Sequence, residues 1–390
     1  MKRFLIVLLC FSLIFSFGIT VFADSAVYDE AENTVNTMPN LDIKAKSAIL
    51  MDAQTGTVLY CKNENEPLPP ASVTKIMTLL LVMEAIENGT FSTEDKVIVS
   101  TNASLKGGSQ IFLEEGEEIT VLDLLKSTII ASANDSATAL AELVSGSEAA
   151  FVDRMNARAK ELGLKNTSFE NCTGLDDTVT NHVSSAYDIV LMSRDLIKYD
   201  LVLQFSSLWQ DTVRNGEFTL TNTNRLVRYY SGCTGLKTGS TDQAGFCVSA
   251  TAKRNGMHLI AVVMGSDNRE DRNEAARCLL DYGFSGFSLY CDGQSVVDNI
   301  PVYYSATSAV ELFSDGISLL VSKGDAGKIE KKYEIPDFLV APQAKGTVVG
   351  SIKYFLNDKE LGSADIYVSS DVERLSLFDI YLSILKGTVA

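Results

Sequence analysis

The sequence predicts a mixed α/β protein of the α+β class, in which helices flank an antiparallel sheet and a small all-β domain follows. Strand candidates lie at both ends of a long helical region instead of alternating with helices, which favours an antiparallel over a parallel sheet. From about residue 295 onward, short apolar runs separated by turn residues replace the helical patterns. The chain has 390 residues, of which 46% are hydrophobic, enough for two domains with their own cores.

The N-terminus has the pattern of a secretory signal peptide. Lys2 and Arg3 precede an apolar run over residues 4–21, and Ala23 provides a small residue for cleavage. The alternative is a retained membrane anchor. We expect residues 1–23 to be a signal peptide and the mature chain to be extracytoplasmic.

Composition excludes some functions and leaves one question open. The net charge of −17 repels nucleic acid, and no basic stripe with interleaved aromatic residues is present. Beyond Cys10, six cysteines remain, which permits either a disulfide set or free thiols. No CxxC pair or HExxH motif indicates a metal site, so we expect neither a metal nor a cofactor.

The first half of the mature chain reads as a hairpin followed by helices. Residues 47–52 and 57–60 are strand candidates around Gln54-Thr55-Gly56. Residues 72–87 form an apolar core helix that Asn88-Gly89 ends, whereas residues 93–120 look irregular and include the acidic surface turn Glu114-Glu115-Gly116-Glu117-Glu118. Further helices are predicted over residues 121–144, 151–162 and 185–197. Small polar residues at 131–136 interrupt the first of these and would present side chains at a turn.

Strands return from residue 211. Asn215-Gly216 is a strong hairpin signal between residues 211–214 and 217–220. Three consecutive strands are then predicted over residues 236–241, 246–252 and 258–265, with a closing helix over 272–281.

The C-terminal region reads as a separate β domain with a tail. Its strand candidates are residues 297–304, 317–321, 347–355 and 364–368. We predict a catalytic domain over 24–290, a β-rich domain over 291–370 and an amphipathic tail over 371–390. The tail is too short and too polar to span a bilayer, and it either lies on a membrane surface or docks on its own domain.

Ser72 and Lys75 are the first candidate catalytic pair. Pro69-Pro70 can end an extended segment and open a helix, and residues three apart on a helix are surface neighbours. A lysine made neutral by desolvation can accept the proton of a serine nucleophile. A serine N-cap beside a solvated lysine explains the same spacing, which recurs at Ser383 and Lys386. The pair therefore needs support from elsewhere in the chain.

Two further motifs supply that support. Ser132-Ala133-Asn134 and Lys237-Thr238-Gly239 follow Ser72-x-x-Lys75 in the order found in penicillin-binding proteins and serine β-lactamases. A second Ser-x-Asn, Ser266-Asp267-Asn268, shows that this triplet alone is not specific. Nearly the whole mature chain resembles the D-alanyl-D-alanine carboxypeptidases, the low-molecular-mass penicillin-binding proteins related to serine β-lactamases.

The resemblance implies an activity and a role for each residue. Ser72 would attack the carbonyl between two terminal D-alanines, with Lys75 as the base, its pKa lowered by burial and by the cation Lys237. Ser132 would relay the proton to the leaving amine, and Asn134 would align Lys75 and the substrate amide. The expected substrate is a peptidoglycan pentapeptide, which loses its terminal D-alanine in the cell wall or at the outer face of the cytoplasmic membrane. Removing it limits cross-linking, and β-lactam antibiotics would acylate the same serine.

The expected substrate-binding residues lie on the Lys237 strand and the closing helix. Lys237 would supply positive potential, and Thr238 would offer a hydroxyl to the terminal carboxylate. Gly239 would leave room for the substrate backbone, and the N–H groups of Ser72 and Ser240 would hold the oxyanion. Arg272 lies where the family places a carboxylate-binding arginine, with a surface arginine as the alternative.

Other chemistries are weighed against this one. His182 and His258 suggest a Ser-His-Asp enzyme, but no Gly-x-Ser-x-Gly elbow exists and both are expected to be structural. A serine β-lactamase needs a deacylating glutamate, and Phe169-Glu170-Asn171-Cys172 resembles the carboxypeptidases instead. A catalytically silent envelope protein is the remaining alternative, against which the intact motifs argue.

Overall fold

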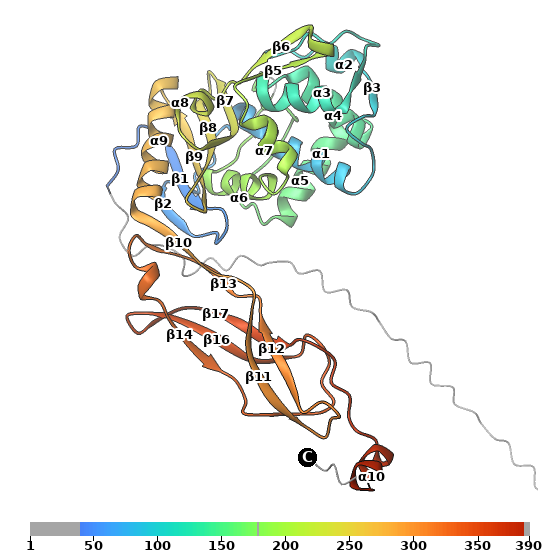
Figure 1. Cartoon of the computed structure of the whole chain (residues 1–390). Coiled ribbons are helices and arrows are strands. Elements are labelled where there is room, and N and C mark those ends of the chain that lie inside the picture. Colours follow the sequence, from blue (N-terminus) through green and yellow to red (C-terminus); the bar gives the residue numbers. More distant parts are fainter. Residues whose placement is uncertain (1–39, 178, 386–390) are drawn as a thin grey trace, which may run out of the picture. The chain divides into compact units, whose positions relative to one another are not determined.

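The computed structural model describes residues 40–177 and 179–385 (Figure 1). The expected signal peptide, residues 1–23, lies outside the described residues. Among the described helices, none has the length and apolar character needed to cross a membrane.

A five-stranded antiparallel sheet organises the first part of the chain. Its strand order is β2-β1-β9-β8-β7, so strands from the beginning and the end of this part pair in the middle. The strands are β1 (Ser47–Asp52), β2 (Val58–Lys62), β7 (Cys233–Thr241), β8 (Gly245–Arg254) and β9 (Met257–Ser266). The first hairpin and the three consecutive strands predicted from the sequence are therefore confirmed.

Helices cover both faces of this sheet, because the side chains that its central strands present to each face are apolar. On β9, Ile260 and Val262 pack into one core, and Leu259 and Ala261 pack into another. Side chains of a strand point alternately to opposite faces, so a strand buried on both faces needs an apolar residue at nearly every position. The helix on the second face is α9 (Arg269–Gly286), the predicted closing helix, which extends further at both ends than expected.

The larger helical layer lies on the first face and includes α1 (Figure 1). Its members with eleven or more residues are α1 (Lys75–Glu87), α4 (Asn134–Ser145), α5 (Glu148–Glu161) and α6 (Ala186–Leu196). The shorter helices of this part of the chain are α2 (Thr101–Ser104), α3 (Val121–Lys126), α7 (Asp200–Ser206) and α8 (Leu226–Tyr229). Helix α1 is buried along almost its whole length, as its continuous apolar sequence predicts.

Two differences from the predicted helices bear on the site. The core helix begins at Lys75, and Ser72 lies in a preceding turn of 3₁₀ helix, η1 (Ala71–Thr74). Residues 121–144 are interrupted as predicted, but over a shorter stretch than 131–136: a π-helical turn, η2 (Ser127–Ala131), ends at Ser132, and α4 begins at Asn134. Turns of this kind are frequent at functional sites.

Two two-stranded antiparallel sheets accompany the helical layer. Residues 93–120, expected to be irregular, contain the paired strands β3 (Lys96–Ile98) and β4 (Glu118–Thr120) as well as α2. The hairpin predicted at Asn215-Gly216 is confirmed as β5 (Gln210–Val213) and β6 (Phe218–Thr221), joined by the turn η3 (Arg214–Gly216). Helices α7 and α8 were not predicted, because neither is long enough to show a helical period.

The C-terminal part is all-β, as predicted, and has its own core. A six-stranded sheet has the order β14-β16-β17-β12-β11-β15, and β10 pairs with β13. Tyr354, Ile366 and Val368 are among the side chains at its centre. Its elements are β10 (Phe287–Asp292), β11 (Ser295–Tyr303), β12 (Ala309–Ser314), β13 (Ile317–Ser322), η4 (Ala326–Lys328), β14 (Glu330–Glu334), β15 (Leu339–Val340), β16 (Val348–Leu356) and β17 (Lys359–Val368). The sequence missed β10, β12, β14 and β15.

The predicted tail contains one helix, α10 (Leu377–Leu385). Before it, Val372 is buried in the β-domain core. The backbone of Arg374 forms an isolated antiparallel β-bridge with that of Ser305. Leu377, at the start of the helix, is 87% exposed and Phe378 is 67% exposed.

The cysteines are free thiols. All six in the described part lack a disulfide, which selects one of the two alternatives that the sequence left open. Cys172 and Cys247 are fully buried, and burial raises the pKa of the Cys247 thiol to about 11.

Candidate active site

The turn η1 brings Ser72 and Lys75 together. Ala71 has a positive φ of 48°, and the chain then makes a single 3₁₀ turn before α1 begins. The Nζ atom of Lys75 lies 3.0 Å from the Oγ atom of Ser72. Ser72 is partly accessible, whereas Lys75 is completely buried. The alternative of a solvated lysine beside an N-cap serine is therefore wrong.

The Lys75 amine has three oxygen partners. Besides Ser72, they are the Oδ1 atom of Asn134 at 2.5 Å and the backbone oxygen of Thr173 at 2.8 Å. Burial lowers the pKa of Lys75 to about 7, although the nearby Cys172 and Asp135 act in the opposite direction. A substantial fraction of the amine is then neutral near pH 7.

A neutral Lys75 fits these three partners in one specific way. A neutral amine has two N–H groups and one lone pair, and the oxygens of Asn134 and Thr173 can only accept hydrogen bonds. They take the two N–H groups, which leaves the lone pair for the hydroxyl proton of Ser72. The site can therefore remove the proton that makes serine a poor nucleophile.

Asn134 is held from three directions at the start of α4. Its Nδ2 atom donates to the backbone oxygen of Gly107 at 2.7 Å, and its own N–H donates to Ser109 at 2.7 Å. The neighbouring Asp135 is fully buried and accepts from the N–H groups of Ile111 and Leu113. Asp135 thus fixes the loop that contacts Asn134. Sequence reasoning missed it, although it directly follows the Ser-x-Asn motif.

Ser132 and Lys237 form a second serine–lysine pair. Ser132 follows η2 in the left-handed region, with φ at 62° and ψ at 28°. This conformation is uncommon for a residue with a side chain and turns the chain sharply between η2 and α4. The Nζ atom of Lys237 donates to the Oγ atom of Ser132 at 2.8 Å and to the backbone oxygen of Thr238 at 2.9 Å.

Burial is the main cause of the lowered pKa of both Lys75 and Lys237. Burial, Lys75 and Arg272 together hold the pKa of Lys237 well below its usual range. The expected contribution of Lys237 to the lowered pKa of Lys75 is not among its main causes, and burial dominates there.

Gly239 lies where the edge strand β7 meets the nucleophile turn. A Cβ atom on it would lie 2.8 Å from the N atom of Ser72 and 2.9 Å from the backbone oxygen of Pro70. The side of Gly239 on which a Cβ atom would lie is thus filled by the nucleophile turn. The absence of a side chain lets the edge strand β7 pack directly against that turn.

A cavity of about 440 Å³ opens above these groups. Six of the residues predicted for the site line it, namely Ser72, Ser132, Thr238, Gly239, Ser240 and Arg272. The remaining three, Lys75, Asn134 and Lys237, are buried and bonded to the lining serines or to one another. The structure therefore brings all the predicted site residues together.

Arg272 lies at one side of this cavity. It is only 3% exposed, so the alternative of a surface arginine is wrong. Burial and the nearby Arg269 lower its pKa to about 10, and its guanidinium donates to the side chain of Asn273. Arg225 and Arg269 also line the cavity, which gives it a positive wall in a protein of net charge −17.

Comparisons with known proteins agree with this geometry. The sequence model of the D-alanyl-D-alanine carboxypeptidase family matches residues 32–268. The chain belongs to this family. Residues 284–374 match the C-terminal domain of penicillin-binding protein 5. The chain is thus a peptidase with the activity class of the D-alanyl-D-alanine carboxypeptidases, and the resemblance noted in its motifs is confirmed.

Individual relatives cover nearly the whole chain. It is 41% identical to the D-alanyl-D-alanine carboxypeptidase DacF of Bacillus subtilis, over 100% of this chain and 98% of that protein. Penicillin-binding protein 5 of Haemophilus influenzae superimposes with a TM-score of 0.75 at 32% identity, covering 87% of this chain and 100% of that one. Penicillin-binding protein D2 of Listeria monocytogenes, solved in its ampicillin-bound form, gives a TM-score of 0.58 at 33% identity, covering 63% and 100%.

A loop for which the sequence predicted no role in the site also contacts the catalytic residues of this carboxypeptidase. In residues 171–176, Asn171 accepts from the N–H groups of Thr173 and Gly174, and Thr173 in turn accepts from Lys75. A Cβ atom on Gly174 would lie 1.8 Å from the backbone oxygen of Ala71, so the loop packs directly on the nucleophile turn. The Asn-x-x-Gly spacing was the only available signal for this contact.

Both histidines of the carboxypeptidase are buried and uncharged. Burial lowers the pKa of His182 to about 4, and the pKa of His258 likewise to about 4. His182 contacts the Thr74 hydroxyl at 2.7 Å and accepts from the N–H of Glu170, whereas His258 contacts Thr234 at 3.3 Å. Neither contacts Ser72 within the part of the chain that is described, as the structural interpretation predicts. Among all the described residues, no group of His, Cys, Asp and Glu side chains could hold a metal ion.

Proposed function

We propose that this protein removes the terminal D-alanine from peptidoglycan stem peptides through an acyl-enzyme on Ser72. The observation that carries the proposal is the buried amine of Lys75, which lies 3.0 Å from the Ser72 hydroxyl and has a pKa of about 7. A nucleophile with a neutral base held at hydrogen-bond distance is the arrangement that covalent catalysis requires.

The first half of the reaction uses both serine–lysine pairs. Ser72 attacks the carbonyl carbon between the two D-alanines and transfers its proton to Lys75. The developing oxyanion is held by the N–H groups of Ser72 and Ser240. The leaving amine takes its proton through Ser132, which Lys237 holds in place. The carbon–nitrogen bond breaks, free D-alanine departs, and water later hydrolyses the ester on Ser72.

Substrate binding uses the edge strand and the positive wall. β7 is the outer strand of its sheet, so an extended peptide can pair with it as an added strand. Arg272 supplies positive charge for the terminal carboxylate, and Thr238 supplies a hydroxyl. The carboxylate would in turn favour the charged form of Lys237, whose pKa is low in the free site. In the free site the Thr238 hydroxyl donates to Thr223 at 2.8 Å, a bond that the carboxylate would replace. β-Lactams would occupy the same place, and penicillin-binding protein D2 of Listeria monocytogenes has been solved in ampicillin-bound and cefotaxime-bound forms.

The rival chemistries have less support in the site. A β-lactamase would need a deacylating glutamate in the loop that contains Glu170. The carboxylate of Glu170 instead accepts hydrogen bonds from the N–H groups of Thr180 and Asn181. A catalytically silent protein would not need Lys75 to be buried against Ser72. We therefore propose an extracytoplasmic enzyme of cell-wall maturation that limits peptidoglycan cross-linking.

The tail adds a proposal about location. Leu377, Phe378 and Tyr381 of α10 are exposed, and we propose that they touch the membrane surface. Vesicle sedimentation with the full chain and with a chain ending at Leu375 tests this, since that end keeps Val372 in its core. Equal sedimentation of the two would refute it.

The mechanism is tested with labelled penicillin, peptide mapping and a D-alanine release assay. We expect the label on Ser72 and release from a peptide that ends in D-Ala-D-Ala. Ser72→Ala should abolish both. The matched control is Ser207→Ala. Ser207 is exposed and distant from Ser72 in the sequence, so this variant should keep both the label on Ser72 and the release of D-alanine. Label at another residue, or undiminished release from Ser72→Ala, would refute the mechanism.

A further inference from the structure

Glu148 lies outside the cavity of the active site but contacts two segments that border its buried groups. It is the first residue of α5, its side chain is 16% exposed, and it does not line the cavity. Its Oε2 atom accepts from the Nζ atom of Lys106 at 2.5 Å and from Asn102 at 3.3 Å. Its Oε1 atom accepts from the thiol of Cys172 at 3.3 Å. An ionised carboxylate can only accept hydrogen bonds, so its two oxygens attach two segments that are distant in the sequence to one helix end.

The Lys106 segment holds Asn134. Gly107, the next residue, has a backbone oxygen that accepts from the Nδ2 atom of Asn134 at 2.7 Å. The backbone oxygen of Ser109 accepts from the N–H of Asn134, also at 2.7 Å. The ion pair of Lys106 with Glu148 is largely shielded from water, because the two side chains are 21% and 16% exposed. A fixed Lys106 therefore fixes the Asn134 side chain, whose Oδ1 atom contacts the catalytic amine.

The Cys172 segment holds the other acceptor of the Lys75 amine. Thr173, the next residue, accepts from this amine through its backbone oxygen at 2.8 Å. Cys172 itself is fully buried, and its backbone oxygen accepts from the Thr78 hydroxyl at 2.6 Å. Burial and the Glu148 carboxylate raise the pKa of the Cys172 thiol, which stays protonated and donates to Glu148. The segment is thus tied to α1 through its backbone and to α5 through its side chain.

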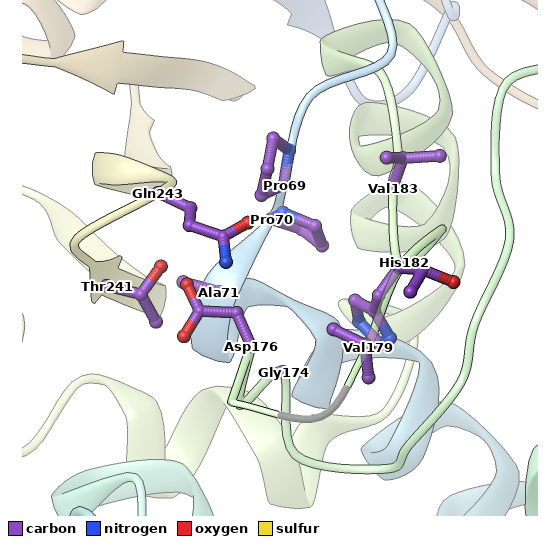
Figure 2. Close-up of a pocket in the computed structure, with 11 residues that line it drawn as sticks. Pro69, Pro70, Ala71, Gly174, Asp176, Val179, His182, Val183, Thr241 and Gln243 are labelled. Atoms are coloured by element: carbon purple, nitrogen blue, oxygen red, sulfur yellow. The ribbon is translucent and has the colours of Figure 1, made fainter.

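The loop that follows Cys172 lies against the nucleophile turn. Figure 2 shows Gly174 and Asp176 of this loop beside Ala71. A Cβ atom on Gly174 would lie 1.8 Å from the backbone oxygen of Ala71, so no side chain separates the two backbones. A shift of the Cys172 segment therefore displaces the oxygen that holds the amine, and no flexible side chain can absorb this shift.

We propose that Glu148 is a positioning residue for the acylation step. Through Lys106 and Cys172 it fixes the two segments that orient the Lys75 amine, one directly and one through the neighbouring amide. The lone pair of this amine then points at the Ser72 hydroxyl. Neither catalytic residue is a hydrogen-bond partner of Glu148 in the part of the chain that the structure describes, so Glu148 acts through their neighbours. The inference rests on the proposed function, because it takes Lys75 as the base.

Glu148 acts on the base through its position and not through its charge. Burial lowers the pKa of Lys75 to about 7, and Cys172 and Asp135 are the neighbours that raise it. The amine of Lys237 also lies nearby, and its own pKa is held well below the usual range. Glu148 is not among the causes that act on Lys75. Removal of its charge should therefore leave this pKa unchanged, so that a loss of rate reports the geometry of the amine.

The test is stopped-flow acylation of the full chain by a fluorescent penicillin between about pH 5.5 and 9. In Glu148→Ala we expect the plateau rate constant to fall by about 10–100-fold, because a misplacement of ~1 Å can cost ~100-fold in rate. The midpoint of the pH profile should stay near pH 7. A lost stabilising contact alone would lower the Tm but leave this rate constant of the folded protein unchanged. A shifted midpoint would overturn the inference, because charge would then be the cause.

A second variant tests the route from Glu148 to the base. Lys106→Met removes the ammonium group and keeps a chain of similar length, so it should lower the plateau in the wild-type protein. In the Glu148→Ala protein the same substitution should have less than about twofold further effect, because its partner is already absent. An unchanged plateau in Lys106→Met, or an equal loss in both proteins, would overturn the inference.

Glu84→Ala is the matched control. Glu84 is 18% exposed and pairs at 2.9 Å with Arg158 of the same helix α5, in an ion pair that includes no residue of either segment. This variant should acylate within about twofold of the wild-type rate. An undiminished plateau in Glu148→Ala would overturn the inference and leave the proposed function intact. Absence of acylation at Ser72 in the wild-type protein would refute the proposed function and this inference with it.

Discussion

The contact between Gly239 and the nucleophile turn makes a sharp prediction for Gly239→Ala. The added Cβ atom would lie 2.8 Å from the N atom of Ser72 and 2.9 Å from the N atom of Val73. Non-bonded heavy atoms of this kind prefer about 3.5–4.0 Å. The edge strand β7 and η1 must therefore separate by ~0.7 Å or more. Both elements are backbone at the contact, so no side chain can rotate away to relieve it.

Two costs follow from this separation. Overpacking a well-packed contact destabilises a protein by ~1–3 kcal/mol, which lowers the Tm of a domain of this size by about 2–4 °C per kcal/mol. The larger effect is on activity. The N–H groups of Ser72 and Ser240 lie on the two sides that move apart, and losing one oxyanion donor reduces kcat by ~10²–10³-fold. We expect the acylation rate to fall by ~100-fold in a protein that is still folded at 25 °C.

The assay is stopped-flow acylation by a fluorescent penicillin, with Tm measured by circular dichroism. Gly286→Ala is the matched control, because a Cβ atom there meets nothing within 4 Å and the backbone needs no left-handed φ. It should acylate within about twofold of the wild-type rate, which the ordinary scatter of surface substitutions allows. Acylation of Gly239→Ala within threefold of wild type would refute the proposed role of this close packing.

The remaining predictions concern charge. Lys75 must be neutral to accept a proton, and its pKa is about 7, so acylation should rise about tenfold per pH unit below pH 7 and level off above it. A rate that is flat from pH 5.5 to 9 would contradict Lys75 as the base. Asn134→Asp places a negative charge at the atom 2.5 Å from this amine, so the midpoint of the same profile should move to higher pH. Arg272→Ala should raise KM for a peptide with a free carboxylate by ~10–100-fold, the value of one or two charge-assisted hydrogen bonds, and leave an amidated peptide unaffected. Equal losses on both peptides would remove Arg272 from carboxylate recognition.

Much of the fold follows from local patterns in the sequence. The alternation of turn residues and apolar runs predicted the hairpin around Thr55, the three strands β7–β9 and the all-β C-terminal part. Short elements were missed where a pattern has too few residues to repeat, as in α7, α8 and β15. Their existence depends on contacts with neighbours distant in the sequence, and such contacts leave no local period.

The candidate site divides in the same way. The spacing of Ser72 and Lys75 and the order of the three motifs were sufficient to identify the residues, because each motif is a few consecutive residues. The sequence could not decide whether Lys75 is a base or a solvated cation. That depends on burial, to which the loop around Thr173 and the start of α4 contribute from residues about 60 to 100 positions away.

The sequence by itself determined the family, the reaction class and the nine residues that meet at the cavity. Only the tertiary structure decided that Gly239 serves the packing of β7 on the nucleophile turn and that Asp176 is left with an unpartnered oxygen beside it. The physical reason is that side-chain identity is local, whereas desolvation and close approach are properties of two surfaces brought together. A buried lysine becomes a base only where the fold removes water and supplies the neighbours.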